Sequence, residues 1–398
     1  MQIKNRKTQR GLYTRMKAAV KIAAALLILV FAVWYGSNNS TSELSETMII
    51  QGMAIDRSSD GFYTVTAEIL NNLQNNPSGF QSSNESRAIC FSAEGKTVSE
   101  AVRYIADKCG KQPLFAHNRV IILGQSVTQS RVSDALDFFE RDFDTKPSML
   151  VCAARGSSAA ALLNADSGAD TVKSEVLEGV LMSGKNNSRT PVVRVADAVN
   201  ALTDEHTSLV LPAVSLVSQK KKNSIELNGC AVFDKENRFA FFLDKKEAEA
   251  LVFMKNGVRK GSLESDFGDT GGVSFLTVSS KTKYRFSFEE GMAVIHLDVT
   301  LEADLNEISG LNFRPLDEKT LASARLAAQN TLKSSIDKCF LKLKSSGCDA
   351  ADFEKRLALY DRTLYKRLIS EEKITFSDFA LEAAVDIKVH RVGDESFS

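Results

Sequence analysis

Two stretches in the C-terminal half alternate apolar and polar residues more regularly than any other part of the chain. In Ala293–Leu305 and Leu381–Val389 every second residue is apolar, which is the pattern of a strand with one face in a core. Between them, apolar residues recur at three- and four-residue steps from Leu321 to Leu343, which predicts a long amphipathic helix, followed by a second helix over residues 351–369. This order predicts an α+β fold in which helices cover one face of a largely antiparallel sheet.

The preceding part of the chain mixes shorter strands and helices. The segments "ETMIIQGMAID" and "FYTVTAEIL" predict a hairpin, and "TVSE" at Thr97–Glu100 predicts the capped start of a helix. Strand and helix patterns then alternate as far as the strand "SLVLPAVSLV", whose proline predicts an edge position. This alternation is typical of a mixed sheet backed by helices.

A run of three lysines, Lys220–Lys222, separates the two regions and is expected to be a solvated linker or a hairpin tip. The chain has 398 residues, enough for two or three domains, because single cores stop growing at roughly 250–300 residues. We therefore expect an α+β region over residues 47–218, with a further division near 155–165 left open, and an α+β domain over residues 223–398.

The N-terminal segment combines positive charge with an apolar run. Seven Lys or Arg residues and no acid stand in the first 21 positions, and the uncharged run Ile22–Tyr35 follows. As a helix its 14 residues would span about 21 Å, and a start at Met16 extends this to about 30 Å, the thickness of a bilayer core. A signal peptide, a lipid attachment site and a permanent anchor all share this arrangement. The bulky Trp34 and Tyr35 leave no small-residue cleavage site, which favours the anchor.

We therefore expect a basic cytoplasmic segment over residues 1–17, a transmembrane signal anchor over 18–36 and a linker over 37–46. The positive charges hold the N-terminal end in the cytoplasm, so the bulk of the chain is expected to be extracytoplasmic. The residues expected to hold the anchor in membrane lipid are Ile22, Leu26, Leu29, Trp34 and Tyr35.

Charge and cysteine content limit the classes of partner and of structural site. Without the seven N-terminal cations the chain carries 43 basic and 50 acidic residues, so it lacks the positive field of a nucleic-acid-binding protein. Its six cysteines show no CxxC or zinc-finger spacing and are expected to be mostly buried thiols. Whether Cys339 and Cys348 are bonded across the turn between them is left open.

No constellation of residues points to catalysis. The chain has four histidines and none of the motifs HExxH, GxSxG, GxGxxG or GxxxxGK[ST], so we expect no enzyme, no cofactor and no metal site. His296 and His390 fall on the polar faces of the two regular strands, where a solvent-facing position is expected. His117 precedes an apolar strand, and either packing or a specific hydrogen bond explains it.

Several short motifs stand in a fixed order along the N-terminal region and continue into the C-terminal one. The motifs are "IIQGMAID" at Ile49–Asp56, "GKT" at Gly95–Thr97, His117, Gly124, "DFFERDFD" at Asp137–Asp144, "ARG" at Ala154–Gly156 and "LNGCAVFD" at Leu227–Asp234. Together they resemble the Ger(x)C family, the C subunits of nutrient germinant receptors of endospore-forming bacteria.

The resemblance implies a non-catalytic extracytoplasmic protein at the inner spore membrane that supports receptor assembly or signalling in nutrient-triggered germination. It implies two partners, an A-type and a B-type integral membrane subunit. The residues that the resemblance makes candidates for a partner-facing surface are His117, Asp137, Arg141 and Asp142.

One departure from the family concerns membrane attachment. Members of the family carry a lipidated cysteine at the end of the signal, whereas this chain has no cysteine before Cys90, so a protein anchor would have to replace the lipid. Two other functions compete with the receptor subunit: a generic membrane-anchored ligand-binding domain, which requires an apolar pocket with convergent polar groups, and an exported hydrolase, which requires a titratable cluster assembled by folding.

Overall fold

The computed structural model describes residues 21–31, 47–71, 87–142, 144–165, 171–219, 222–258, 260–268, 271–309, 316–392 and 395–396. The chain forms two units, Met1–Thr47 and Met48–Ser398, and each is described by itself.

In the first unit, residues 21–31 are helical, and the side chains of Ile22, Leu26 and Leu29 are exposed. Trp34 and Tyr35 lie outside the described residues. None of the helices in the described part of the chain combines the length and the apolar character that a membrane crossing requires.

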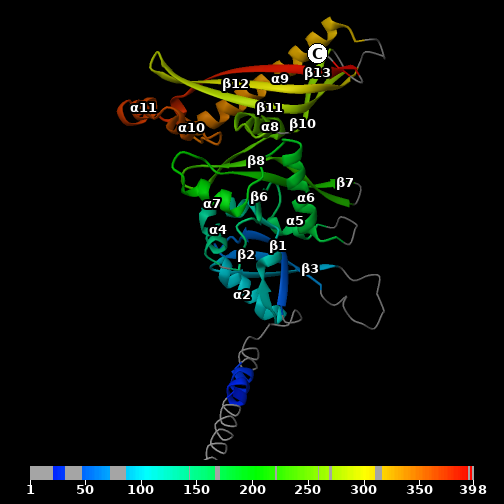
Figure 1. The fold of residues 1–398 in the computed structure, drawn as a ribbon, viewed down its shortest axis with the longest axis vertical. Helices are drawn as coiled ribbons and strands as arrows, with labels where there is room; N and C mark the ends of the chain where they lie inside the picture. Colours follow the sequence, from blue (N-terminus) through cyan, green and yellow to red (C-terminus); the bar gives the residue numbers. More distant parts are fainter. Residues whose placement is uncertain are drawn as a thin grey trace, which may run out of the picture. The chain divides into compact units, whose positions relative to one another are not determined.

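The second unit begins with a large mixed sheet, drawn from blue to green in Figure 1. Its strands in the described residues are β1 (Thr47–Arg57), β2 (Tyr63–Leu70), β3 (Ala88–Gly95), β4 (Gln112–Leu114), β5 (Val120–Leu123), β6 (Leu150–Ala154), β7 (Val210–Gln219), β8 (Lys222–Phe233) and β9 (Phe239–Leu243). They are ordered β3-β2-β1-β5-β6-β7-β8-β9, and β4 pairs with β1.

Helices cover both faces of this sheet. The helices are α2 (Val98–Cys109), α3 (Gln125–Thr128), α4 (Val132–Arg141), α5 (Ala159–Leu163), α6 (Lys173–Asn186) and α7 (Val195–Thr203), with the short turn η3 (Phe115–His117). Buried residues of α2, α4 and α7 share one core with Ile50, Met53 and Ile55, whereas α5 and α6 share another with Ala54 and Ile122. The alternation along β1 therefore places the two cores on opposite faces.

This sheet is mixed, as the alternation of strands and helices predicts, and a largely antiparallel arrangement does not extend to its centre. β1 with β5, β5 with β6, and β6 with β7 are all parallel pairs. Parallel neighbours need crossover connections, and the helices between these strands supply them. The four residues of β5 are all fully buried, as expected of a central parallel strand.

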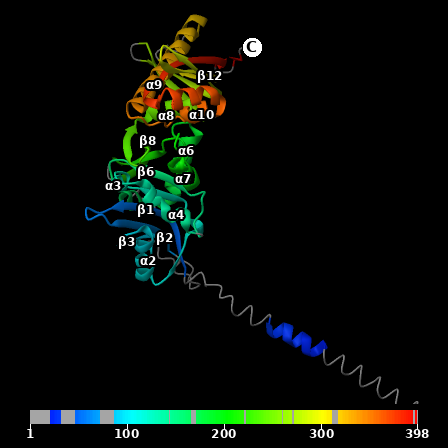
Figure 2. The same cartoon turned by 90° about the vertical axis from the view of Figure 1, so that its left-hand side faces the viewer.

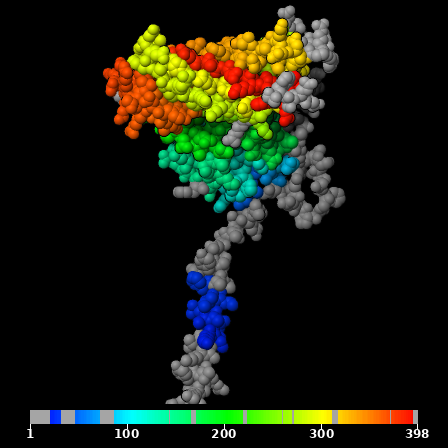
Figure 3. Space-filling view, turned by 45° about the horizontal axis from the view of Figure 1, so that its top comes forward, coloured from blue at the N-terminus to red at the C-terminus, as the bar shows by residue number. Residues whose placement is uncertain are grey.

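The second sheet has the order β10-β11-β12-β13-β14 in the described residues. Its strands are β10 (Gly261–Phe267), β11 (Gly271–Glu289), β12 (Met292–Ile308), β13 (Ala380–Val392) and β14 (Glu395–Ser396). The sheet is antiparallel except for β12 and β13, which are parallel because the helical segment between them crosses over. Figure 3 shows β12 and β13, in yellow and red, reaching the surface side by side.

Helices cover one face of the second sheet, as the alternation of apolar and polar residues along its strands predicts. They are α8 (Lys245–Met254), α9 (Glu318–Ser345), α10 (Phe353–Tyr360), α11 (Arg362–Tyr365), the π-helical turn η4 (Lys366–Glu371) and η5 (Phe376–Asp378). The helix expected over residues 351–369 is therefore broken, because Asp361 leaves the helical conformation at φ −139° and instead caps α11 through Leu364 N–H, 2.9 Å away.

Helix α8 and the last strands of the first sheet contribute residues to the core of the second sheet. Cys230, Val232 and Leu243 lie in the same core as the second sheet, and α8 lies between β8 and that sheet (Figure 2). Gln219 pairs with Lys222, so β7 and β8 form a hairpin within the first sheet, whereas Lys220 and Lys221 of the lysine run lie outside the described residues. A boundary at this turn would divide a continuous sheet, and the assignment of residues to domains there stays a prediction.

Two further points concern Pro212, whose expected edge position is wrong, and the cysteines, for which a bond between Cys339 and Cys348 was left open. Pro212 lies in an interior strand, not at an edge, and the ladder between β7 and β8 shifts register after it, which removes the need for its missing N–H. All six cysteines are free thiols, so Cys339 and Cys348 are not bonded to each other.

Candidate functional site

The motif residues Asp137, Arg141 and Asp142 lie at the end of α4. Arg141 Nε and Asp137 Oδ1 form an ion pair at 2.8 Å within the helix, and their side chains are 76% and 49% exposed. Asp142 Oδ1 accepts a hydrogen bond of 2.9 Å from Asp144 N–H and so shapes the turn that follows. Leu136 and Phe139 form the buried face, which leaves the charged residues to solvent.

His117 lies near this helix on the turn η3. Phe115, two residues earlier, packs against Phe138 of α4 with ring centroids 5.6 Å apart. The side chain of His117 is exposed, and it makes no hydrogen bond or ion pair with the residues that the structure describes. His117, Asp137 and Arg141 are therefore exposed and Asp142 is half-buried, and all four lie on α4, at its end, or on the turn η3 that packs against it through Phe115.

Other motifs meet at the carboxyl ends of the parallel strands. Asp56, at the end of β1, accepts hydrogen bonds of 2.9 Å from the N–H groups of Ala159 and Ala160 in the first turn of α5. A Cβ on Gly124 would lie 1.9 Å from Asp56 Oδ1, so only glycine fits after β5. Ligands commonly bind at this edge of open α/β sheets, but here α5 and its capping carboxylate fill it.

The arginine of the "ARG" motif joins three strands. Arg155 follows β6, and its Nη1 donates to the carbonyl oxygens of Asn228 at 2.8 Å and Leu243 at 3.2 Å. Its guanidinium carbon lies 4.7 Å from the centre of the Phe242 ring. Arg155 thus holds the end of β9, where the chain passes into α8, against β6 and β8.

Sequence reasoning missed a buried acid with a similar role. Glu68 on β2 is only 2% exposed and accepts hydrogen bonds from the N–H groups of Lys173 at 2.6 Å and Ser174 at 2.8 Å. It therefore caps α6 from a distant strand. The sequence pattern hides this role, because the alternation along β2 places Glu68 on the polar face together with Thr64 and Thr66.

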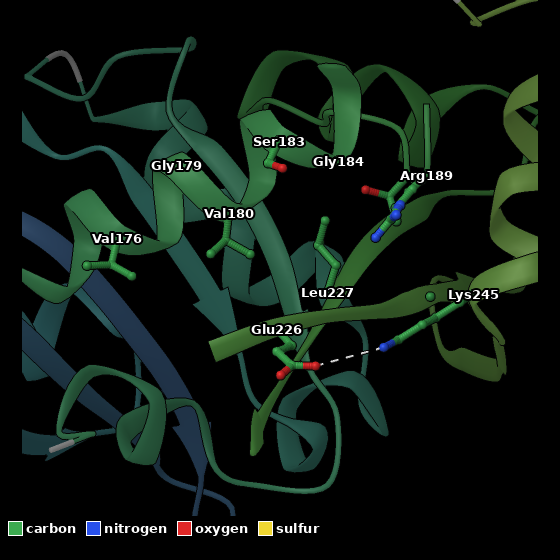
Figure 4. A pocket seen from close by; sticks show the side chains of 11 residues that line it. Val176, Gly179, Val180, Ser183, Gly184, Arg189, Glu226, Leu227 and Lys245 are labelled. Carbon is green, nitrogen blue, oxygen red and sulfur yellow. Dashed lines mark ion pairs between the residues drawn. The ribbon is translucent and has the colours of Figure 1, made fainter. Parts of the chain in front are cut away.

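A cavity of about 470 Å³ opens between α6, β8 and the start of α8 (Figure 4). Its size falls within the ordinary range of small-molecule sites, roughly 300–1,000 Å³. The residues that line it are Val176, Gly179, Val180, Ser183, Gly184, Arg189, Thr190, Glu226, Leu227, Gly229 and Lys245. None of them had been singled out from the sequence as a site residue, because they come from four separate segments.

Some polar groups that line this cavity have a partner, and others have none among the described residues. Glu226 and Lys245 form an ion pair at 3.9 Å, drawn as a dashed line in Figure 4. The guanidinium of Arg189 has no hydrogen bond and no carboxylate within 4.0 Å in the described part of the chain. Thr190 is 2% exposed, and its Oγ1 has no hydrogen-bond partner there. An unpaired buried hydroxyl costs about 1–3 kcal/mol.

Glu249, one turn after Lys245 on α8, interacts electrostatically with Arg189. Burial raises the pKa of Glu249 to about 7, and the positive charge of Arg189 opposes this rise only in part. Glu249 is therefore largely proton-bearing in mildly acidic solution and then does not neutralise Arg189. Among the charged residues that line the cavity, Arg189 and Lys245 stand against Glu226 alone, so the lining carries one net positive charge.

A Ser–His–Glu arrangement lies on the open face of the second sheet. His296 Nε2 is 2.8 Å from Ser287 Oγ, and His296 Nδ1 is 3.0 Å from Glu382 Oε2, so this histidine is not simply solvent-facing. Ser287 also contacts Glu289 Oε1 at 2.6 Å, which competes for the hydroxyl proton. Ser287, His296 and Glu382 lie on β11, β12 and β13, which are neighbouring strands of the sheet, and His296 is directly opposite Glu382. The contacts of Ser287, His296 and Glu382 are therefore better explained as pairing between neighbouring strands than as a site of nucleophilic catalysis.

A buried acidic loop joins α9 to α10. Asp349 is 1% exposed and accepts a hydrogen bond of 2.7 Å from Glu354 N–H, and burial raises its pKa to about 7. Glu354, on α10, places its Oε2 3.9 Å from His206 Nδ1. Among the described residues, no group of three or more His, Cys, Asp or Glu side chains has the geometry to hold a metal ion.

Comparisons with known proteins place these features in a family context. Residues 40–216 match the model of the spore germination protein N-terminal domain, and residues 228–393 match that of the spore germination B3/GerAC-like C-terminal domain.

Two Bacillus subtilis (strain 168) proteins are similar in sequence. Spore germination protein KC is 22% identical over 84% of this chain and 86% of its own length, and spore germination protein B3 is 24% identical over 73% and 76%. The crystal structure of the GerBC protein matches 85% of this chain and 96% of its own at a TM-score of 0.55 and 19% identity, so it shares the fold.

Proposed function

Because the chain belongs to the Ger(x)C family of spore germination proteins, we propose that it is the C-type subunit of a nutrient germinant receptor and acts in spore germination without catalysis. The observation that carries the proposal is that the N-terminal and C-terminal family models match in order over both sheets of the second unit. In this role the protein supports assembly of the receptor, or signalling within it, beside A-type and B-type integral membrane subunits.

The proposed location is the outer face of the inner spore membrane, with the basic segment of residues 1–17 in the cytoplasm and residues 18–36 as a single anchor. Seven cations before an apolar run that ends in Trp34 and Tyr35 support this arrangement. The described helix, residues 21–31, is about 16 Å long and covers only the middle of the proposed span.

The proposed contact with partner subunits is the exposed surface formed by His117, Asp137, Arg141 and Asp142. Arg141 is 76% exposed, and its ion pair with Asp137 lies within one helix. Such a pair contributes only about 0.3–0.5 kcal/mol to stability, so its charges are available for recognition at little cost to the fold.

Alanine at both Arg141 and Asp142 tests this surface. We expect the double variant to fold normally. Its affinity purification from spore membranes should recover fewer receptor subunits. Spores that carry it should release dipicolinic acid more slowly in response to nutrients. The control replaces Lys333 and Asp337, a cation and an acid 3.4 Å apart on α9, by alanine, and so removes the same two kinds of charge from another helix. Wild-type assembly and germination in the Arg141/Asp142 variant would exclude this surface.

The neighbouring genes and a deletion strain test the proposed function itself. We expect two adjacent reading frames for multi-span membrane proteins, and we expect spores without this chain to lose the response to one nutrient and regain it on complementation. An unchanged response of the deletion strain to every nutrient would count against a receptor role. The cavity beside α6 favours ligand binding as a second candidate function.

A further inference from the structure

We propose that the cavity between α6, β8 and α8 binds a small monocarboxylate with a short, branched apolar body. The proposal concerns a ligand of this chain itself and does not rest on its role as a receptor subunit. It follows from three properties of the cavity walls: an apolar surface, an unpaired cation and an unpaired hydroxyl.

The apolar part of the ligand is defined by α6 and β8. Val176 and Val180 face the cavity from α6, and Leu227 faces it from β8 (Figure 4). Gly179, on the same side of α6, adds no side chain that would fill the space between them. A branched chain of three or four carbons can cover these three side chains and remove their apolar surface from water.

The charged part of the ligand is defined by Arg189. The charges of Glu226 and Lys245 offset each other at 3.9 Å, whereas Arg189 has no carboxylate within 4.0 Å in the described residues. A guanidinium binds a carboxylate through two parallel hydrogen bonds. Thr190, the next residue, offers a hydroxyl that lacks any other partner in that part of the chain and can donate to the same carboxylate.

The loop that carries Arg189 is held in place before any ligand arrives. Ser188 donates through its hydroxyl to the carbonyl oxygen of Lys260, and Arg189 N–H donates to the carbonyl oxygen of Gly184 at 2.8 Å. A Cβ on Gly184 would lie 2.4 Å from Thr190 Oγ1, so this glycine lets the loop pack directly on α6. A site whose parts are already fixed loses less entropy on binding.

Isovalerate and its neutral amide, isovaleramide, test the proposal with the full-length chain. Saturation-transfer NMR titration should detect isovalerate with a Kd of about 1 mM, a realistic affinity for a ligand of this size. Isovaleramide has the same apolar body and nearly the same shape, so it should bind about tenfold more weakly or worse, because it lacks the charge that Arg189 recognises.

Two variants and one control locate the site. Arg189→Gln should weaken isovalerate at least about tenfold and leave isovaleramide unchanged, because it removes only the cation. Ser183→Trp, at an exposed position of α6 that lines the cavity, should block both ligands by filling it. Lys185→Gln removes a charge from the same helix outside the cavity and should bind both ligands as the wild type does.

Three outcomes would overturn the proposal: no isovalerate binding to the wild type at about ten times the expected Kd, equal binding of the acid and the amide, or a response of Arg189→Gln that equals that of Lys185→Gln. Because N-acetylvaline presents the same carboxylate on a peptide-like body, its titration distinguishes the two sources of this chemistry. Tighter binding than isovalerate indicates a chain terminus, and weaker binding indicates a free acid.

Discussion

At the scale of single residues, several acids act as caps for distant helices. Asp56 binds the first turn of α5 across 103 positions of sequence, and Glu68 binds the first turn of α6 across 105. Hydrogen bonds between a carboxylate and backbone N–H groups are among the stronger ones, because the acceptor is charged. The conformation of "IIQGMAID" is therefore tied to helices that lie far along the chain.

Replacing Asp56 by alanine should lower the free energy of unfolding by about 1–3 kcal/mol, because two N–H groups of α5 lose their acceptor. Chemical denaturation measures this difference. The exposed Asp60, in the turn after β1, provides the control: Asp60→Ala should change stability by less than about 0.5 kcal/mol. Equal stability of the two variants would refute the capping role of Asp56.

Asp349 should make stability depend on pH. Its pKa is raised by burial to about 7, whereas an unfolded chain gives about 3.9. At a pH between these two pKa values, Asp349 carries a proton in the folded protein and has lost it in the unfolded chain. The stabilising contribution of the protonated acid is therefore complete below about pH 4 and is lost as the pH rises through about 7.

Unfolding of Asp349→Asn, measured at steps from pH 4 to pH 8, tests this expectation. The wild type should lose stability relative to the variant as the pH rises, by at most about 1.4 kcal/mol per pH unit. Asp60→Asn should follow the wild type. Parallel curves for the wild type and Asp349→Asn would show that Asp349 does not hold a proton in the folded state.

At the scale of elements, the helices and strands that were predicted well are those whose pattern is local. The buried stripe of α9 runs through Ala324, Leu332 and Leu343, at the positions that the three- and four-residue steps predicted. Thr97 also caps α2 as expected, since its Oγ1 accepts from Glu100 N–H at 3.1 Å. Both depend on residues within a few positions of each other.

The elements that were predicted poorly depend on pairing across the chain. The crossover helices make β5 and β6 parallel. The sequence of a short apolar strand does not indicate whether its neighbour in the sheet runs parallel or antiparallel to it. Pro212 was placed at an edge because the bulge that accommodates it appears only with β8 in place. The cavity was missed for the same reason, because Arg189 and Lys245 belong to different elements.

The long helix α9 offers a test at this scale. Leu332 is 2% exposed and Leu341 is 61% exposed on the same helix. Leu332→Ala should destabilise the protein by about 2–5 kcal/mol because it opens a cavity under the second sheet. Leu341→Ala should cost less than about 1 kcal/mol. Similar losses for both variants would show that α9 does not bury the face assigned to it.

At the scale of the whole molecule, the proposed protein anchor differs from the lipid attachment that the family resemblance implies. Because no cysteine stands before Cys90, the proposal gives residues 18–36 the role of that lipid. Mass spectrometry of the mature protein should find an uncleaved N-terminal segment without added lipid. A mature chain that begins near Ser37, or one that carries diacylglycerol, would contradict the anchor.

The central claim is that this chain works as one subunit of a germinant receptor, and purification from its own membrane tests that claim most directly. An affinity tag after Ser398 should recover, from detergent-solubilised inner membranes of spores, two multi-span membrane proteins encoded beside this chain, in amounts comparable to the chain itself. Recovery of the tagged chain alone, under conditions in which the two membrane proteins remain intact and soluble, would contradict the account.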